Sequence, residues 1–204
     1  MYNEIQRYIC SLSEWFLKDG SNIYDLGCST GETAKNLFVK FPNKKINFVG
    51  YDLSKEMIKM SKKKNNKNLS KAKFKVADIL KVNYKKNKDF FLSILTFPFL
   101  NSEKRIKLFK KIYKSLKHGG SLIFVDKIRS SNSNFEDIFN QIYFDFKIEN
   151  KLNAAQVLNK SKSIRGSMEL FELSDIDKFL SKSGFKKREV FFRWYNFVGI
   201  IAIK

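Results

Sequence analysis

The residues best suited to chemistry in this chain form a short loop, Asp25-Leu26-Gly27-Cys28-Ser29-Thr30-Gly31, between an apolar run and a helix-forming segment. Gly27 and Gly31 let the backbone turn tightly and approach a ligand where a Cβ atom would collide. The helix that follows directs its free backbone amides toward the same place. The loop therefore predicts a ligand-binding turn; the alternative is a turn that merely packs a helix tightly against a strand.

A second carboxylate narrows the class of ligand that this loop could bind. Asp52 follows Gly31 by 52 − 31 = 21 residues, the offset of an acid that accepts hydrogen bonds from ribose hydroxyls. The fingerprint of dinucleotide sites has a glycine where this chain has Ser29, so a pyrophosphate is disfavoured. A carboxylate at Asp25 would repel phosphate oxygens but attract an ammonium group. Together the two acids predict an amino acid joined to a nucleoside.

The spacing of apolar residues predicts the elements that must position these acids. Strands alternate with helices over the first 126 residues, which indicates an α/β protein with a doubly wound, mostly parallel sheet and helices on both faces. In such sheets ligands bind beyond the carboxyl ends of the strands, so the residues after Asp25, Asp52, Asp78 and Thr96 are the place to look. We expect strands at 22–27, 45–52, 74–78, 90–97, 121–126, 185–193 and 197–204, helices at 2–18, 32–41, 54–60, 106–116, 132–160 and 173–183, and a helix end with an exposed loop at 61–73.

Composition limits the class of protein. With 204 residues, 43% of them hydrophobic, the chain fits one domain over 1–204 with one substantial core, divided into an N-terminal helix (1–20), a βαβ core (21–128), and a helical insertion with closing strands (129–204). The net charge of +20 excludes an acidic solvating protein. Nucleic-acid binding is an alternative that we do not favour, because lysine is spread along nearly every segment. That alternative would use the stripe Lys62, Lys63, Lys64, Lys67, Lys71, Lys73 and Lys75.

Cysteine and histidine content point to a reducing compartment and argue against a metal centre. Cys10 and Cys28 form no Cys-x-x-Cys pair, and His118 is the only histidine, so we expect neither a disulfide framework nor a metal site. The first residues do not resemble a signal peptide, and no run approaches the roughly 20 apolar residues of a membrane span. We therefore expect a soluble cytoplasmic protein. Residues 117–120 predict an exposed turn that carries His118.

The loop, Asp52 and the Asp78-Ile79 pair together resemble the class I S-adenosylmethionine-dependent methyltransferase family. This resemblance implies a Rossmann-like, seven-stranded sheet whose C-terminal strand is antiparallel, with S-adenosylmethionine as the cofactor. It places the amino-acid end at the loop, the ribose at Asp52 and the adenine at Asp78 and Ile79, although Asp78 could instead serve only as a loop cap. The cofactor-binding residues implied are Tyr2, Asp25, Gly27, Cys28, Ser29, Gly31, Asp52, Leu53, Asp78, Ile79 and Leu95.

A narrower resemblance covers nearly the whole chain. Tyr2-Asn3-Glu4-Ile5, Ile23-Tyr24-Asp25-Leu26-Gly27-Cys28-Ser29 and Asn196-Phe197 are similar to the carboxy-S-adenosylmethionine synthase family. The resemblance implies an enzyme that moves a carboxyl group from prephenate to the methyl carbon of S-adenosylmethionine, so the bound cofactor is that molecule or its carboxylated form. It also implies a homodimer whose product serves modification of a tRNA wobble uridine. The alternative is an ordinary methyltransferase that acts on a small molecule or RNA.

The new carboxylate of such a product needs a fixed cation, ideally a bidentate arginine. The family places this arginine in a Lys-Arg-Ser-Met stretch after the long helix, where this chain has residues 160–168. We therefore predict catalytic roles for Arg165 and, less directly, Lys162; Arg165 is out of register and could equally be one more solvated charge. At Ile94 this chain also departs from the family, which has an Asn there.

Overall fold

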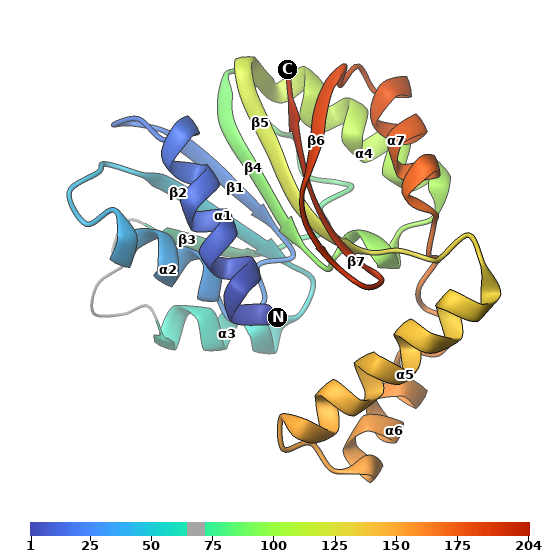
Figure 1. Cartoon of the computed structure of the whole chain (residues 1–204). Coiled ribbons are helices and arrows are strands. Elements are labelled where there is room, and N and C mark those ends of the chain that lie inside the picture. The colour runs from blue at the N-terminus through green and yellow to red at the C-terminus, as the bar shows by residue number, and fades with distance from the viewer. Residues whose placement is uncertain (65–71) are drawn as a thin grey trace.

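Seven strands form one sheet in the part of the chain that the computed structural model describes, residues 1–64 and 72–204 (Figure 1). The strand order is β3-β2-β1-β4-β5-β7-β6; β7 pairs antiparallel with both β5 and β6, and the other four pairs are parallel. This confirms the doubly wound, mostly parallel sheet with an antiparallel C-terminal strand. The strands are β1 (Asn22–Leu26), β2 (Asn47–Asp52), β3 (Ala72–Val76), β4 (Lys88–Ile94), β5 (Leu116–Lys127), β6 (Lys187–Trp194) and β7 (Phe197–Ile203).

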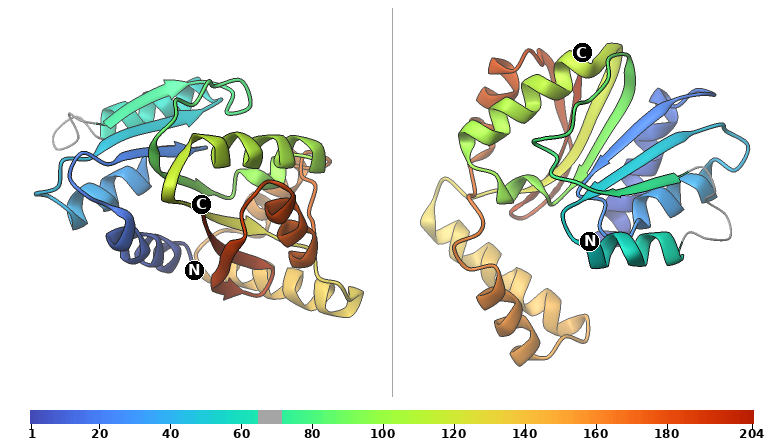
Figure 2. Two further views of the ribbon diagram at one scale, coloured as in Figure 1. Left: turned by 90° about the horizontal axis from the view of Figure 1, so that it is seen from above. Right: turned by 180° about the vertical axis from the view of Figure 1, so that it is seen from behind.

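Helices cover both faces of this sheet. In Figures 1 and 2, α1, α2 and α3 lie on one face and α4 and α7 on the other, while α5 and α6 stand away from the sheet. The part of the expected loop that falls at 65–71, with Lys67 and Lys71, lies outside the described residues. The helices are α1 (Tyr2–Phe16), α2 (Glu32–Lys40), α3 (Lys55–Lys64), α4 (Ser102–Ser115), α5 (Ser133–Glu149), α6 (Ala154–Ser163) and α7 (Leu173–Lys182), with a 3₁₀ turn, η1 (Phe97–Phe99).

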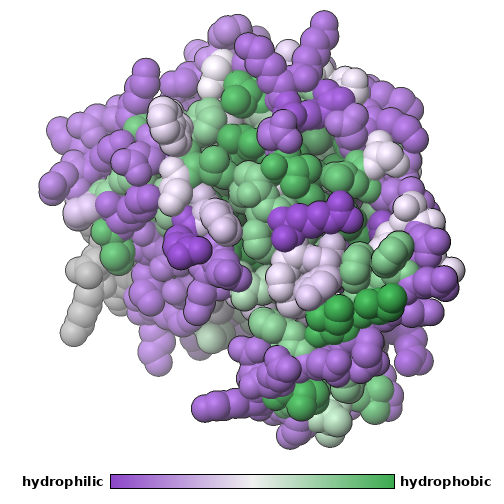
Figure 3. Space-filling model, in the orientation of Figure 1, coloured by the Kyte–Doolittle hydropathy of each residue, from purple (hydrophilic) through white to green (hydrophobic). Residues whose placement is uncertain are grey.

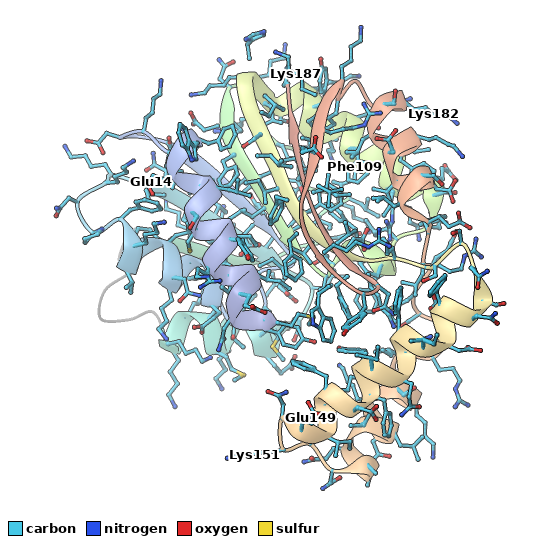
Figure 4. All side chains as sticks on the ribbon, viewed as in Figure 1. Glu14, Phe109, Glu149, Lys151, Lys182 and Lys187 are labelled. Atoms are coloured by element: carbon cyan, nitrogen blue, oxygen red, sulfur yellow. The ribbon has the colours of Figure 1, made fainter. Side chains whose placement is uncertain are left out.

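Alternating side chains of the central strands divide the core into two layers. On β4, Phe90 and Leu92 face the α1–α3 layer, and Phe91 between them faces the α4–α7 layer. All three are fully buried, as expected for a parallel strand covered on both faces. Phe109 of α4, labelled in Figure 4, is also fully buried and packs in the second layer. The sheet is therefore held rigidly from both sides.

The expected carboxyl ends of the third and fourth strands were wrong. We expected a strand from 90 to 97, but β4 ends at Ile94 because Leu95 adopts a left-handed φ of 56° and Pro98 favours the 3₁₀ turn that follows. The third strand also ends earlier, at Val76, which leaves Asp78 two residues beyond it. Both differences lengthen the loops at the carboxyl edge of the sheet, where ligands bind.

The expected turn at 117–120 was wrong as well. These residues belong to β5, which begins directly after α4 at Leu116. The Gly119 amide donates to the Lys204 carbonyl over 2.9 Å, and the Lys204 amide donates to Gly120 over 3.0 Å. Pairing with the last residue of the chain thus extends this segment as a strand. His118 is exposed there, as predicted.

A buried ion pair connects three parts of the molecule. Arg105 of α4 and Asp126 of β5 are both fully buried, with Nη1 and Oδ2 2.6 Å apart. Arg105 Nε also donates to the Leu100 carbonyl (3.2 Å) and Nη2 to the Glu169 carbonyl (3.4 Å). Burial raises the pKa of Asp126 to about 6 despite Arg105. Removing one partner of such a pair typically costs about 3–5 kcal/mol, so this contact firmly fixes the segments after β4 and α6.

The α5–α6 hairpin stands away from the sheet (Figure 1) and contacts the rest of the chain through one face of α5. α5 contains 17 residues, none of them buried. Glu149 and Lys151, labelled in Figure 4, lie at its far end from the sheet. Asn153 begins α6 with a reciprocal capping box to Gln156, which fixes the turn between the two helices. In the described part of the chain, no helix is long and apolar enough to cross a membrane.

Candidate active site

A cavity of about 360 Å³ opens at the carboxyl ends of β1, β2, β3 and β4. This is the edge that the sequence predicted, at the point where the chain reverses its order of strands between β1 and β4. Of the predicted site residues, those that line the cavity are Gly27, Ser29, Asp52, Leu53, Asp78, Ile79 and Leu95.

The loop after β1 owes its shape to residues in the left-handed region. Gly27 has φ 82°, and Gly31, which begins α2, has φ 78°. A Cβ atom on Gly27 would lie 1.9 Å from Thr96 Oγ1, so the position admits only glycine. Ser29 adopts φ 47°, a conformation that costs free energy in a non-glycine residue. The loop is therefore held in one strained, ligand-facing shape.

Asp52 holds that loop in place. Its Oδ2 accepts a hydrogen bond from the Ser29 amide and its Oδ1 one from the Ser54 amide, both over 2.9 Å. Each carboxylate oxygen has a further lone pair, and the residue lines the cavity. Asp52 is thus oriented to accept two more hydrogen bonds from a ligand, as adjacent ribose hydroxyls would supply.

Asp25 lies in β1, two residues before Gly27; it is buried and does not itself line the cavity, and it lacks a full set of partners. Its side chain is 2% exposed, and Oδ2 has no hydrogen-bond partner among the described residues. Burial, together with the nearby charge of Asp52, raises the pKa of Asp25 to about 7. A buried carboxylate without a cation is costly, so a ligand ammonium group would supply what the site lacks.

The opposite end of the cavity is apolar, with one carboxylate. Ile79 is 8% exposed and lines the cavity together with Asp78. Asp78 Oδ1 accepts the Leu80 amide over 2.9 Å, so the loop-cap role weighed from the sequence is present and coexists with a place on the cavity wall. Leu53, 73% exposed, forms the outer rim. A flat ring with a polar edge fits this end.

The segment after β4 contributes residues that the sequence-based prediction missed. Leu95 has φ 56°, and its amide donates to the Val125 carbonyl over 2.8 Å. The left-handed turn brings Thr96 against Gly27 and continues into η1. Pro98 was the available signal, because it cannot continue a parallel strand. The lining residues that were not among the predicted site residues are Thr96, Phe99 and Leu100 of this segment, Ile94 at the end of β4, and Ala77 after β3.

The other predicted residues do not line the cavity. Cys28 is buried, and its Sγ would lie 2.7 Å from a Cβ on Gly50, which makes it a packing residue; burial raises the pKa of its thiol. Tyr2 donates or accepts a hydrogen bond with Tyr143 on α5 over 2.9 Å. Gly31 acts through the start of α2. These cofactor contacts stay predictions.

The predicted catalytic cations lie beyond the cavity wall. Lys162 and Arg165 are exposed at the end of α6, and neither forms an ion pair with any described residue. Four residues later the chain returns to the cavity rim, where the Glu169 amide donates to the Pro98 carbonyl over 2.8 Å. The catalytic role of both cations stays a prediction.

Comparison with known proteins gives one consistent family. Residues 23–120 match a model of a methyltransferase domain. The carboxy-S-adenosyl-L-methionine synthase of Staphylococcus epidermidis is 36% identical over 203 residues, covering 100% of this chain and 87% of the relative. The synthase of Methylococcus capsulatus is 31% identical, covering 100% and 85%. The match to the two synthases spans the insertion and the closing strands as well as the βαβ core.

Solved structures share the fold at low sequence identity. Phosphoethanolamine N-methyltransferase 2 of Haemonchus contortus, in complex with S-adenosyl-L-methionine, superimposes with a TM-score of 0.69, 16% identity, and coverage of 95% of this chain and 51% of that one. Human N-acetylserotonin methyltransferase gives a TM-score of 0.61, 18% identity, and coverage of 90% and 47%. These likenesses establish the class I methyltransferase fold.

The residues present fit S-adenosylmethionine. The unpartnered oxygen of Asp25 matches its ammonium group, the two oriented oxygens of Asp52 match the ribose, and the wall at Ile79 and Asp78 matches the adenine. The close backbone approach at Gly27 leaves room for the amino-acid end. The cofactor would therefore lie across the ends of β3, β2 and β1 in that order.

We predict that the affinity for S-adenosylmethionine rises with pH below 7. The cofactor's amine, with a pKa of about 8, stays protonated there, while Asp25, whose pKa is raised to about 7, must lose its proton to pair with it. The dissociation constant should therefore fall by up to about tenfold per pH unit between pH 5.5 and 7. Calorimetry should also detect release of a proton.

Asp25→Asn should bind at least about tenfold more weakly at pH 7.5 and without this slope; the same slope in the variant would contradict the assignment.

We predict that Gly27→Ala weakens cofactor binding at least about tenfold, because the added Cβ collides with Thr96. Gly20→Ala is a matched control: Gly20 has the same φ of 82° but nothing within 4 Å of the added Cβ. The control should lose about 1 kcal/mol of stability and keep its affinity. Equal affinity in the two variants, measured by titration calorimetry, would mean that the contact with Thr96 is unimportant.

Proposed function

Because this chain belongs to the carboxy-S-adenosyl-L-methionine synthase family, we propose that it transfers a carboxyl group from prephenate to the methyl carbon of S-adenosylmethionine. The observation that carries the proposal is the match along the whole chain, together with the unpartnered, buried carboxylate of Asp25, two residues before the cavity-lining Gly27. We further propose that the product serves modification of a tRNA wobble uridine, as the resemblance implies.

The residues of the chain would orient and shield the reacting groups. Asp25 would hold the ammonium group of the cofactor and Asp52 its ribose, across the ends of β1 and β2. When bound, S-adenosylmethionine would supply a sulfonium that acidifies its methyl carbon, so that this carbon could exchange a proton for the carboxyl group. Prephenate would lose that carboxyl group together with its hydroxyl and become aromatic, and the hydroxyl would leave with the proton as water. Ile94, Phe99 and Leu100 give an apolar wall, which excludes water from a reactive carbon. Arg165 or Lys162 would hold the newly formed carboxylate.

One observation favours the alternative of an ordinary methyltransferase. Ile94, part of the cavity wall, stands where the family resemblance has an Asn. An apolar wall next to the methyl group suits simple methyl transfer, in which alignment of nucleophile, methyl and sulfur is the main requirement. The two functions differ in the mass of the cofactor product, so one experiment separates them.

We predict that incubation with S-adenosylmethionine and prephenate yields a cofactor heavier by one carbon dioxide. Prephenate labelled with ¹³C in its carboxyl groups should transfer that label, detected by mass spectrometry. Asp52→Ala, which loses the ribose contact, should reduce the yield at least about tenfold. Lys187→Met, an exposed change on β6, should not alter it. A demethylated cofactor, with no carboxylated product, would identify a methyltransferase instead.

The α5–α6 hairpin supports the pairing of two copies, which we also propose. Hydrophobic residues, green in Figure 3, lie exposed over this hairpin. Exposed apolar groups on so small a unit mark an interaction surface. The residues are Phe135, Ile138, Phe144, Ile148, Leu152 and Leu158, each between 39% and 55% exposed.

We predict a mass of twice 24.0 kDa by light scattering. Ile138→Glu and Leu158→Glu should shift the protein to the monomer, because a charge buried in the interface lacks a partner. Val39→Glu, a change at a 71% exposed site on α2, is the control and should stay dimeric. A monomeric unaltered protein would rule out the pairing.

A further inference from the structure

Two lysines beside one tyrosine form a cationic cluster that the proposed cofactor site does not use. Lys127 ends β5 and Lys147 lies on α5. Their Nζ atoms lie 5.6 Å and 3.9 Å from the centroid of the Tyr143 ring. Neither lysine forms an ion pair with any residue in the described ranges. A single aromatic ring attracts cations but does not neutralise two of them.

The electrostatics of this cluster favour an anion. Burial lowers the pKa of Lys127, which Glu136 partly opposes. Burial and the charge of Lys127 lower the pKa of Lys147. Glu136 is already engaged, since its oxygens accept the Ser130 amide at 2.7 Å and Asn140 Nδ2 at 3.1 Å. Two partly buried cations that repel each other would bind an anion between them favourably.

Aromatic side chains surround the two lysines. The Tyr143 ring lies 4.8 Å from the Phe197 ring and 6.1 Å from the Trp194 ring, and the Trp194 ring lies 5.0 Å from that of Phe146. The Tyr143 hydroxyl meets the Tyr2 hydroxyl at the start of α1. The cluster therefore combines two cations, two hydroxyl groups and aromatic surface, a combination that suits a small organic acid with a hydrophobic body.

The sheet places the cluster beside the cavity, at the ends of β4 and β5. Leu95, which lines the cavity, donates its amide to Val125 of β5. Lys127 lies two residues beyond Val125, about 7 Å along the strand, and its side chain points to the same face. Since the cofactor would extend across β3, β2 and β1, the next space in strand order is at the ends of β4 and β5.

We propose that Lys127 and Lys147 bind a carboxylate of the small organic acid that is the second substrate, with its body against Tyr143 and Trp194. The proposal rests on the proposed function for the identity of that acid, prephenate. Ammonium groups on both sides of a carboxylate form charge-assisted hydrogen bonds. This site differs from Arg165 and Lys162, which we propose for the carboxylate that forms on the cofactor.

A fluorescence titration tests the site without catalysis. Trp15, 85% exposed on α1, and Trp194 are the two tryptophans, so Trp15→Phe leaves Trp194 as the reporter. In this background, prephenate added to the complex with S-adenosylhomocysteine should change the Trp194 emission. Lys127→Met and Lys147→Met should each raise the dissociation constant for prephenate at least about tenfold, and Lys147→Arg should restore most of the affinity. Affinity for S-adenosylmethionine should not change.

Lys187→Met provides the matched control, because Lys187 is exposed on β6 far from the α5–α6 hairpin (Figure 4). It removes the same charge and should leave prephenate binding unaltered. Lys147→Met, a change on a helix without buried residues, keeps the test valid should Lys127→Met fail to fold. Unchanged prephenate affinity in the folded variants would overturn the site.

The same variants separate this site from the proposed function. Lysine-dependent binding of prephenate with no carboxylated product would retain the site and reject the synthase. Carboxyl transfer with an unaltered KM for prephenate in both Met variants would retain the synthase and reject the site. Carboxyl transfer with a raised KM for prephenate in the two Met variants, and an unaltered dissociation constant for S-adenosylmethionine, supports both the site and the synthase.

Discussion

The arrangement of the site depends on one buried carboxylate that its own chain leaves incompletely paired. Asp25 is the last but one residue of β1, buried close to the cavity-lining loop, with an oxygen that finds no partner among the described residues. Burial and Asp52 raise its pKa to about 7, so ionisation of this carboxyl group has an electrostatic cost that a neighbouring cation would offset. In the low dielectric of the protein interior, the attraction between opposite charges is stronger, and the cost of removing a charge from water is also larger. The buried position of Asp25 on a central strand of the sheet therefore favours the binding of an ammonium group.

Backbone strain around Asp25 also prepares the site for a ligand. Gly27, Ser29 and Leu95 all lie in the left-handed region, and each lines the cavity. Strain of this kind persists only where surrounding structure enforces it. Here Asp52 holds the Ser29 amide, the Val125 carbonyl holds the Leu95 amide, and Thr96 fills the space beside Gly27. Two strands and their loops therefore hold a preorganised surface, which lowers the cost of binding.

The sequence was most informative where local chemistry decides the structure. Asp25, Gly27 and Asp52 could be placed because a glycine-rich turn after a strand and an acid after the next strand have local signatures. Phe99 and Leu100 could not, because the left-handed turn at Leu95 that carries the chain toward them has no signature in the residue type of a leucine. Residues 117–120 looked like a turn because the strand they form depends on Lys204, far along the chain. Lys127 and Lys147 meet only through the placement of α5.

Strand order then decides where a second substrate can lie. The cofactor's contacts fall on β3, β2 and β1 in turn, and the next neighbours are β4 and β5. The far faces of that space come from elements outside the βαβ core: η1 and the segment after α6, both fixed by Arg105, and α5, which carries Tyr143 and Lys147. The core is common to class I methyltransferases, whereas these outer segments differ between chains that share only the fold. The choice between carboxyl and methyl transfer therefore depends on the residues beyond β4, because they decide which molecule meets the activated methyl carbon.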